Sequence, residues 1–164
     1  MDAIDTLLLA IKRIKEPRFF SSERGYQGQL VSELDRLLGD SADITRPLVE
    51  QEYQKRAKVH GITFRPDIIV HVPFERGVSP SRRHDNYLVI MLKLSAKEKK
   101  ANEDFAKLSA ICSALEYPLG ALVNVASADL WLPHYPRKGG EKFNLHEFAI
   151  MLHDGCLDIR KSQA

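Results

Sequence analysis

One aspartate and one lysine lie on two apolar segments in the middle of the chain, where their spacing could support phosphate chemistry. Asp67 follows Pro66 and opens the β-branched run 68–70, and Lys93 lies near the end of a second apolar run, 87–94. A carboxylate is a ligand that Mg²⁺ prefers, and an ammonium can stabilise the charge of a phosphate. If the two runs are neighbouring strands, these residues could hydrolyse a phosphodiester with a metal-activated water.

The direction of each side chain follows from its place on the strand, because successive side chains point to opposite faces. On the second run, aliphatic residues at alternate positions predict one buried face: Leu88, Ile90, Leu92 and Leu94. Met91 and Lys93 would then share the other face with Asp67. Met91 would lie beside Asp67 and Lys93, so Met91→Glu is expected to add a carboxylate ligand next to Asp67.

The elements that must position these residues can be read from periodicity and from turn residues. We expect a single α/β domain over residues 1–164 with a mixed four-stranded sheet, since a strand, a helix and a further strand form a right-handed parallel crossover. The expected helices are 2–15, 22–38, 99–115 and a last one that Asn144 and Glu147 open and Gly155 ends; the expected strands are 48–55, 63–72, 87–94 and 119–125.

This order of elements, together with Pro66-Asp67 and Lys93, resembles the PD-(D/E)xK or restriction-endonuclease-like superfamily over about residues 22–125. The resemblance implies an αβββαβ core, here with an extra helix at each end. It also implies a nuclease that acts on DNA with Mg²⁺ or Mn²⁺.

The resemblance assigns roles to individual residues. Asp67 and the main-chain carbonyl of Leu92 would bind the metal ion, and Lys93 would orient or activate the attacking water. A glutamate of the first core helix would support the site; Glu23 fits that place best and Glu33 is second. In some branches a first-strand glutamate, here Glu52, also takes part as a catalytic group and ligand.

The chain departs from the family pattern at Met91, because a thioether is too soft a ligand to replace a carboxylate on Mg²⁺. Three interpretations stay open. Another acid completes the site: Glu52, or a migrated acid of the next helix such as Glu98 or Glu103. The site binds metal weakly and acts slowly. Or the chain is a non-catalytic module that binds nucleic acid or a protein partner.

Each candidate residue also has an ordinary structural interpretation. Asp67 could bond backbone amides at a strand start, Lys93 could extend from a strand end into water, and Glu52 could pair across strands. Glu23 could be a surface charge of its helix. His71 would serve packing or substrate contact rather than act as a base.

Composition limits the class of protein but not its partner. The net charge is +2, with 24 basic and 22 acidic residues, so DNA binding would depend on a local basic surface. The candidates for phosphate contacts flank the third strand: Arg82, Arg83, Lys97, Lys99 and Lys100. The absence of a long apolar run or a signal-peptide pattern, and only two cysteines, predict a cytoplasmic protein without membrane contact. A homodimer stays open.

Overall fold

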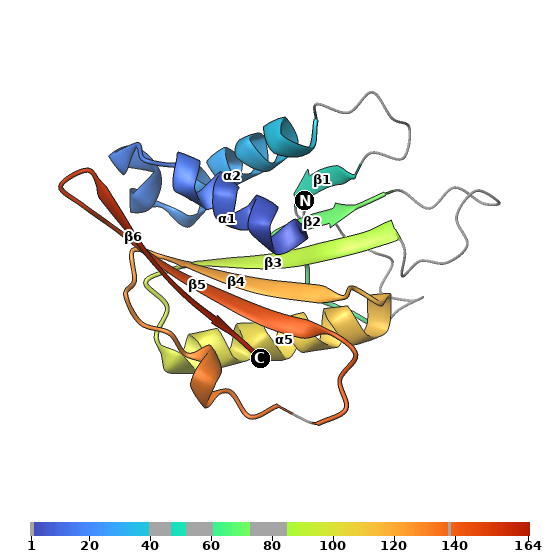
Figure 1. Ribbon diagram of the computed structural model, residues 1–164. Helices are drawn as coiled ribbons and strands as arrows, with labels where there is room; N and C mark the ends of the chain where they lie inside the picture. The colour runs from blue at the N-terminus through green and yellow to red at the C-terminus, as the bar shows by residue number, and fades with distance from the viewer. Residues whose placement is uncertain (1, 40–46, 52–60, 73–84, 138) are drawn as a thin grey trace.

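The computed structural model describes residues 2–39, 47–51, 61–72, 85–137 and 139–164. A mixed sheet forms the middle layer, with helices α1 and α2 on one face and helix α5 on the other (Figure 1). Its six strands lie in the order β1-β2-β3-β4-β5-β6. The α/β class is confirmed, but the sheet has two more strands than the four expected.

The described residues of the N-terminal half form two α-helices and three strands. Its elements are α1 (Ala3–Arg13), a 3₁₀ turn η1 (Pro17–Ser21), α2 (Glu23–Leu38), β1 (Leu48–Gln51), β2 (Ile68–His71) and β3 (Asn86–Leu94). The strands β1, β2 and β3 are antiparallel neighbours. Ser22 caps α2 by accepting a hydrogen bond from the N–H of Gly25 at 3.1 Å, which places Glu23 in the first turn.

The C-terminal half completes the sheet. Its elements are α5 (Glu98–Leu115), β4 (Leu119–Val125), a 3₁₀ turn η2 (Leu132–His134), β5 (Asn144–His153) and β6 (Cys156–Gln163). The strands β3, β4 and β5 run parallel, and β6 is antiparallel to β5. The expected crossover from β3 through α5 to β4 is therefore present. Within the described ranges, none of the helices combines the length and apolar character needed to cross a bilayer.

Strand β3 is buried on both faces, as expected for a central strand with parallel pairing. Leu88, Ile90 and Leu92 pack in the core beneath α1 and α2. Val89 and Met91 pack in a second core beneath α5. The expected buried face is confirmed for these three leucine and isoleucine positions, but Leu94 is 36% exposed, so its prediction was wrong.

The expected C-terminal helix was wrong, because residues 144–163 form the β5–β6 hairpin instead. The turn contains Asp154 and Gly155, with φ values of 48° and 76°. Two consecutive residues with positive φ are what a tight hairpin turn requires, and Asp-Gly is a favoured pair there. The pair that suggested a capped helix start, Asn144 and Glu147, lies within β5.

Glu147 has a structural role in β5. Its side chain is fully buried, and Oε2 accepts hydrogen bonds from the N–H groups of Trp131 at 2.7 Å and Leu132 at 2.8 Å. Burial raises the pKa of this carboxyl above its ordinary 4.5, while the two N–H groups act in the opposite direction. The carboxylate thus attaches the connection between β4 and β5 to the sheet.

Glu147→Gln should change how stability depends on pH. When folding raises the pKa of an acid, the folded state is stabilised while that acid is protonated. This stabilisation is lost as pH rises from the pKa of the unfolded state through the pKa of the folded state. The free energy of unfolding of the variant relative to wild type should therefore increase between about pH 4 and about pH 7. Urea unfolding at both pH values measures this difference; a difference that stays constant or shrinks contradicts the prediction.

Candidate metal-dependent active site

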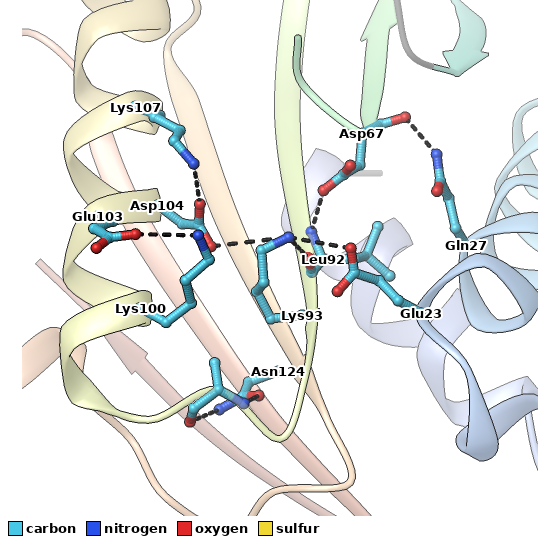
Figure 2. Close-up of polar contacts among 11 residues, drawn as sticks. Glu23, Gln27, Asp67, Leu92, Lys93, Lys100, Glu103, Asp104, Lys107 and Asn124 are labelled. Carbon is cyan, nitrogen blue, oxygen red and sulfur yellow. Dashed lines mark hydrogen bonds and ion pairs between the residues drawn. The ribbon is translucent and has the colours of Figure 1, made fainter. Parts of the chain in front are cut away.

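Four charged residues, three of them on separate elements and one directly before β2, meet at the end of β3 (Figure 2). Asp67 precedes β2, Lys93 lies on β3, Glu23 on α2 and Asp104 on α5. The strands place Asp67 and Lys93 in the sheet, while the two helices bring one acid from each side. The sequence predicted the first three of these residues and missed Asp104.

Lys93 is the centre of this cluster. Its ammonium donates to the Leu92 carbonyl at 2.6 Å and to Glu23 Oε1 at 3.1 Å. It also lies 3.9 Å from Asp104 Oδ2. The Lys93 side chain is only 18% exposed, so the interpretation in which it simply extends into water does not describe it. The ammonium instead lies among carboxylate oxygens from two helices and the carbonyl oxygen of its own strand.

Asp67 is bound to the main chain of β3. Its Oδ2 accepts the N–H of Leu92 at 2.7 Å, as the structural interpretation of this residue expected. Gln27 of α2 donates to the carbonyl of Asp67 at 2.9 Å and fixes the backbone there. Burial raises the pKa of Asp67 as the largest effect; the Leu92 hydrogen bond and Lys93 lower it, and Glu23 and Asp104 raise it further. Both neighbouring acids therefore raise the pKa of Asp67, even though its carboxylate accepts a hydrogen bond from the main chain.

Asp104 is the acid that sequence analysis missed. It is completely buried; Oδ1 accepts from the Lys107 ammonium at 2.7 Å, and Oδ2 has no hydrogen-bond partner. A signal was present in the sequence, because Asp104 interrupts the apolar stripe of this helix, formed by Ala101, Phe105, Leu108, Ile111, Cys112 and Leu115. An acid on the buried face of a helix needs a nearby cation or other polar partners, and here the lysines provide them.

The turn between β3 and α5 fixes the distance between Lys93 and Asp104. Asn124 of β4 binds both main-chain groups of Ala96, accepting its N–H at 2.8 Å and donating to its carbonyl at 3.2 Å. The indole of Trp131 donates to the same carbonyl at 3.1 Å. Ser95, also in this turn, has a positive φ of 52°. The contacts of Asn124 and Trp131 hold the turn in this conformation. The cluster is therefore supported by rigid backbone on β4.

Met91 shares the α5-side face of β3 with Lys93, as the strand period predicted, but it does not occupy an open site. It is 3% exposed and belongs to the apolar cluster that includes Ile69, Phe105 and Leu108. The expectation that Met91→Glu supplies a ligand therefore needs revision. Neither acid named as a migrated ligand replaces it: Glu98 is exposed, and Glu103 is exposed and binds Lys100 at 3.1 Å.

The other sequence candidates lie apart from the cluster or outside the described residues. Glu33 pairs with Arg13 and Arg36 on the helical layer, and His71 contacts Glu50 at 2.7 Å. The basic residues Lys97, Lys99 and Lys100 are exposed where α5 begins. Three candidates fall outside the described ranges: Glu52, Arg82 and Arg83.

The oxygen atoms of the cluster suit Mg²⁺ or Mn²⁺ in chemical type. Asp67 and Asp104 offer carboxylates and Leu92 a carbonyl, and such hard oxygens are the donors these ions prefer. Among the described residues, no three Asp, Glu, His or Cys side chains are close enough to hold an ion as they stand. The Lys93 ammonium already bonds the Leu92 carbonyl, so an ion would have to displace it from that oxygen. Asp104 Oδ2 is buried without a hydrogen bond, which suits a ligand.

Met91→Glu should now destabilise the protein by about 2–5 kcal/mol, because a carboxylate would be buried among apolar side chains. Met91→Leu conserves volume and polarity, so it should cost less than about 1.5 kcal/mol. Urea unfolding of both variants against wild type checks this. A stable Met91→Glu protein that binds Mn²⁺ more tightly would restore the original expectation of an open ligand position.

Comparison with protein-family models, with curated proteins and with solved structures finds no match for this chain.

Proposed function

We propose that this chain is a nuclease of the PD-(D/E)xK type that hydrolyses DNA phosphodiester bonds with Mg²⁺ or Mn²⁺. In this proposal Asp104 takes the place of the acid missing from the third strand. The observation that carries it is the meeting of Asp67, directly before β2, and Lys93, on the adjacent strand β3, with a fully buried acid of α5. Structural ion pairs are usually exposed or mutually bonded, whereas Asp104 keeps one buried oxygen without a hydrogen bond.

The residues divide the work as follows. Asp67, Asp104 and the carbonyl of Leu92 would hold the cation, which when bound supplies an activated water and neutralises phosphate charge. Lys93 would leave the Leu92 carbonyl and place its ammonium beside the water or the phosphate oxygen. Glu23, at 3.1 Å from that ammonium and 41% exposed, would keep it at the mouth of the site.

Exposed basic residues near the cluster suit an extended polyanion. Lys97, Lys99 and Lys100 lie where the helix that carries Asp104 begins. Phosphate contacts from such residues position a nucleic acid without reading its sequence. This placement supports a backbone-binding role for the start of α5 in the proposed function.

A second candidate function is a non-catalytic module that binds nucleic acid or a protein. The observation that favours it is the present state of the cluster, in which Lys93 pairs with Glu23, Lys107 pairs with Asp104 and Met91 belongs to an apolar core. A cluster closed in this way can serve stability alone. Cation binding separates the two candidates, since only the first one requires it.

Calorimetric titration with Mn²⁺ should show one binding event in the wild type that Asp67→Asn and Asp104→Asn each weaken by at least about tenfold, because each removes a charged ligand. Glu103→Gln is the matched control, since Glu103 neighbours Asp104 on α5 but is exposed and bound to Lys100. Its Mn²⁺ affinity should stay within about twofold of wild type. No heat of binding at millimolar Mn²⁺ would favour the non-catalytic module.

Lys93→Gln should separate cation binding from catalysis. Removing the ammonium frees the Leu92 carbonyl and one side of Asp104, so Mn²⁺ affinity should equal or exceed that of wild type. DNA cleavage should fall by at least about 100-fold, because the group beside the water and phosphate is lost. Calorimetry and a gel assay on single- and double-stranded DNA measure the two effects; loss of both properties together would assign Lys93 a structural role.

A further inference from the structure

Lys107 neutralises a buried acid while its own side chain reaches the surface. Its ammonium lies 2.7 Å from Asp104 Oδ1, and the side-chain exposures are 33% for Lys107 and 0% for Asp104. One turn earlier, Lys100 and Glu103 have the same i,i+3 spacing, but both are about half exposed, at 51% and 47%. Figure 2 shows the two pairs side by side on α5. Lys107 bonds Asp104 directly, whereas Lys100 bonds Glu103 and interacts with Asp104 and Glu23 only at longer range.

The charge of the cluster explains why Lys107 is needed in the free protein. A buried carboxylate without compensation is strongly unfavourable. Lys93 is 3.9 Å from Asp104 and is bonded to Glu23 and Leu92, so it neutralises Asp104 only in part. Lys107 makes the one close contact to this acid that the described residues provide.

We propose that Lys107 is a reserve phosphate-binding group, held on Asp104 until a divalent cation replaces it. The cation would take over the charge of Asp104, and the released ammonium would bind a phosphate of the DNA backbone. The inference rests on the proposed cation site and adds a residue that contacts the substrate only when that site is loaded. Lysine suits this role, because it is a compact charge on a flexible four-carbon stem with three donors.

The charge balance supports a phosphodiester as the group bound. With Asp67 ionised, the acids Asp67, Glu23 and Asp104 exceed the ammonium groups of Lys93 and Lys107 by one negative charge. One divalent cation changes that excess to one positive charge. A site with a single positive charge complements the single negative charge of a backbone phosphodiester.

The proposal makes cation binding and DNA binding reciprocal. If the cation frees Lys107 for DNA, DNA must raise the affinity for the cation by the same factor. Removing the ammonium should therefore have opposite effects on the two ligands. The affinity for the cation in the absence of DNA should rise, since a competing charge is lost. The affinity for DNA should fall only when the cation is present.

The experiment compares Lys107→Gln, Lys107→Arg and the matched control Lys100→Gln. Calorimetry gives Mn²⁺ affinity without DNA, and fluorescence anisotropy gives the affinity for a short DNA duplex with and without Mn²⁺, over a range of salt. A gel confirms that the DNA stays intact during each measurement. Circular dichroism confirms that each variant is folded.

For Lys107→Gln we expect Mn²⁺ affinity to rise roughly fivefold. With Mn²⁺ present, the slope of log affinity for DNA against log salt should shrink by about 0.9, the value for one phosphate contact. Without Mn²⁺ its DNA affinity should match wild type. Lys107→Arg should keep the coupling. Lys100→Gln should leave Mn²⁺ affinity unchanged, and any DNA affinity that it loses should be lost equally with and without the ion.

Two results for Lys107→Gln would overturn the proposal: a loss of DNA affinity that is equal with and without Mn²⁺, or a fall in Mn²⁺ affinity. The first makes Lys107 an ordinary phosphate contact, and the second makes it a support for Asp104.

Asp104→Asn tests the release independently of metal, because it should free Lys107 and raise DNA affinity without any cation. If wild type binds no Mn²⁺ but Asp104→Asn gains DNA affinity that Lys107→Gln then removes, the proposed metal site fails while the release of Lys107 stands. If Asp104→Asn gains nothing, the release fails.

Discussion

The ammonium of Lys93 joins the two helical layers of this protein across the end of its central strand. It bonds Glu23 from α2 on one side and approaches Asp104 from α5 on the other, while it also bonds the carbonyl of its own strand. Charges gathered in so little solvent are tolerated only when each has a partner. The charge balance where both helices approach β3 therefore depends on the contacts of this one cation.

The separation of Met91 from Asp104 follows from the packing of α5. The helix presents a row of apolar side chains to β3, and Met91 fits among them with 3% exposure. Asp104 lies on the same helix, with its Oδ2 3.9 Å from the ammonium of Lys93. A carboxylate on the strand would be buried among hydrocarbon, whereas a carboxylate on the helix has two lysines within reach. The acid is thus stable on α5 and would be unstable at position 91.

The β4–β5 connection and the C-terminal hairpin support the turn that links the two sides of the cluster. Glu147 of β5 holds the N–H groups of Trp131 and Leu132, and the Trp131 indole donates to the carbonyl of Ala96. Asn124 binds the same residue from β4. These contacts fix the turn from which α5 starts, and thereby the distance from Lys93 to Asp104. Two strands that lie far from the site in sequence therefore contribute to its geometry.

The sequence by itself determined the elements whose signals are local. Periodicity and caps located α1, α2 and α5, and β-branched runs located β3 and β4 to within a residue. The expected strand 63–72 was too long, because β2 begins only at Ile68. The resemblance that the sequence carries also named Asp67, Lys93 and Glu23, and strand direction and the helix start predicted where these side chains lie. The tertiary structure decided the rest. The Asn144 and Glu147 spacing reads as a helix cap until the Asp154-Gly155 turn pairs β5 with β6. Asp104 reads as one more charge of a lysine- and glutamate-rich helix until α5 packs on β3 and buries it beside Lys93. Burial and contacts between distant segments select among local alternatives of similar propensity, and no local pattern contains that information.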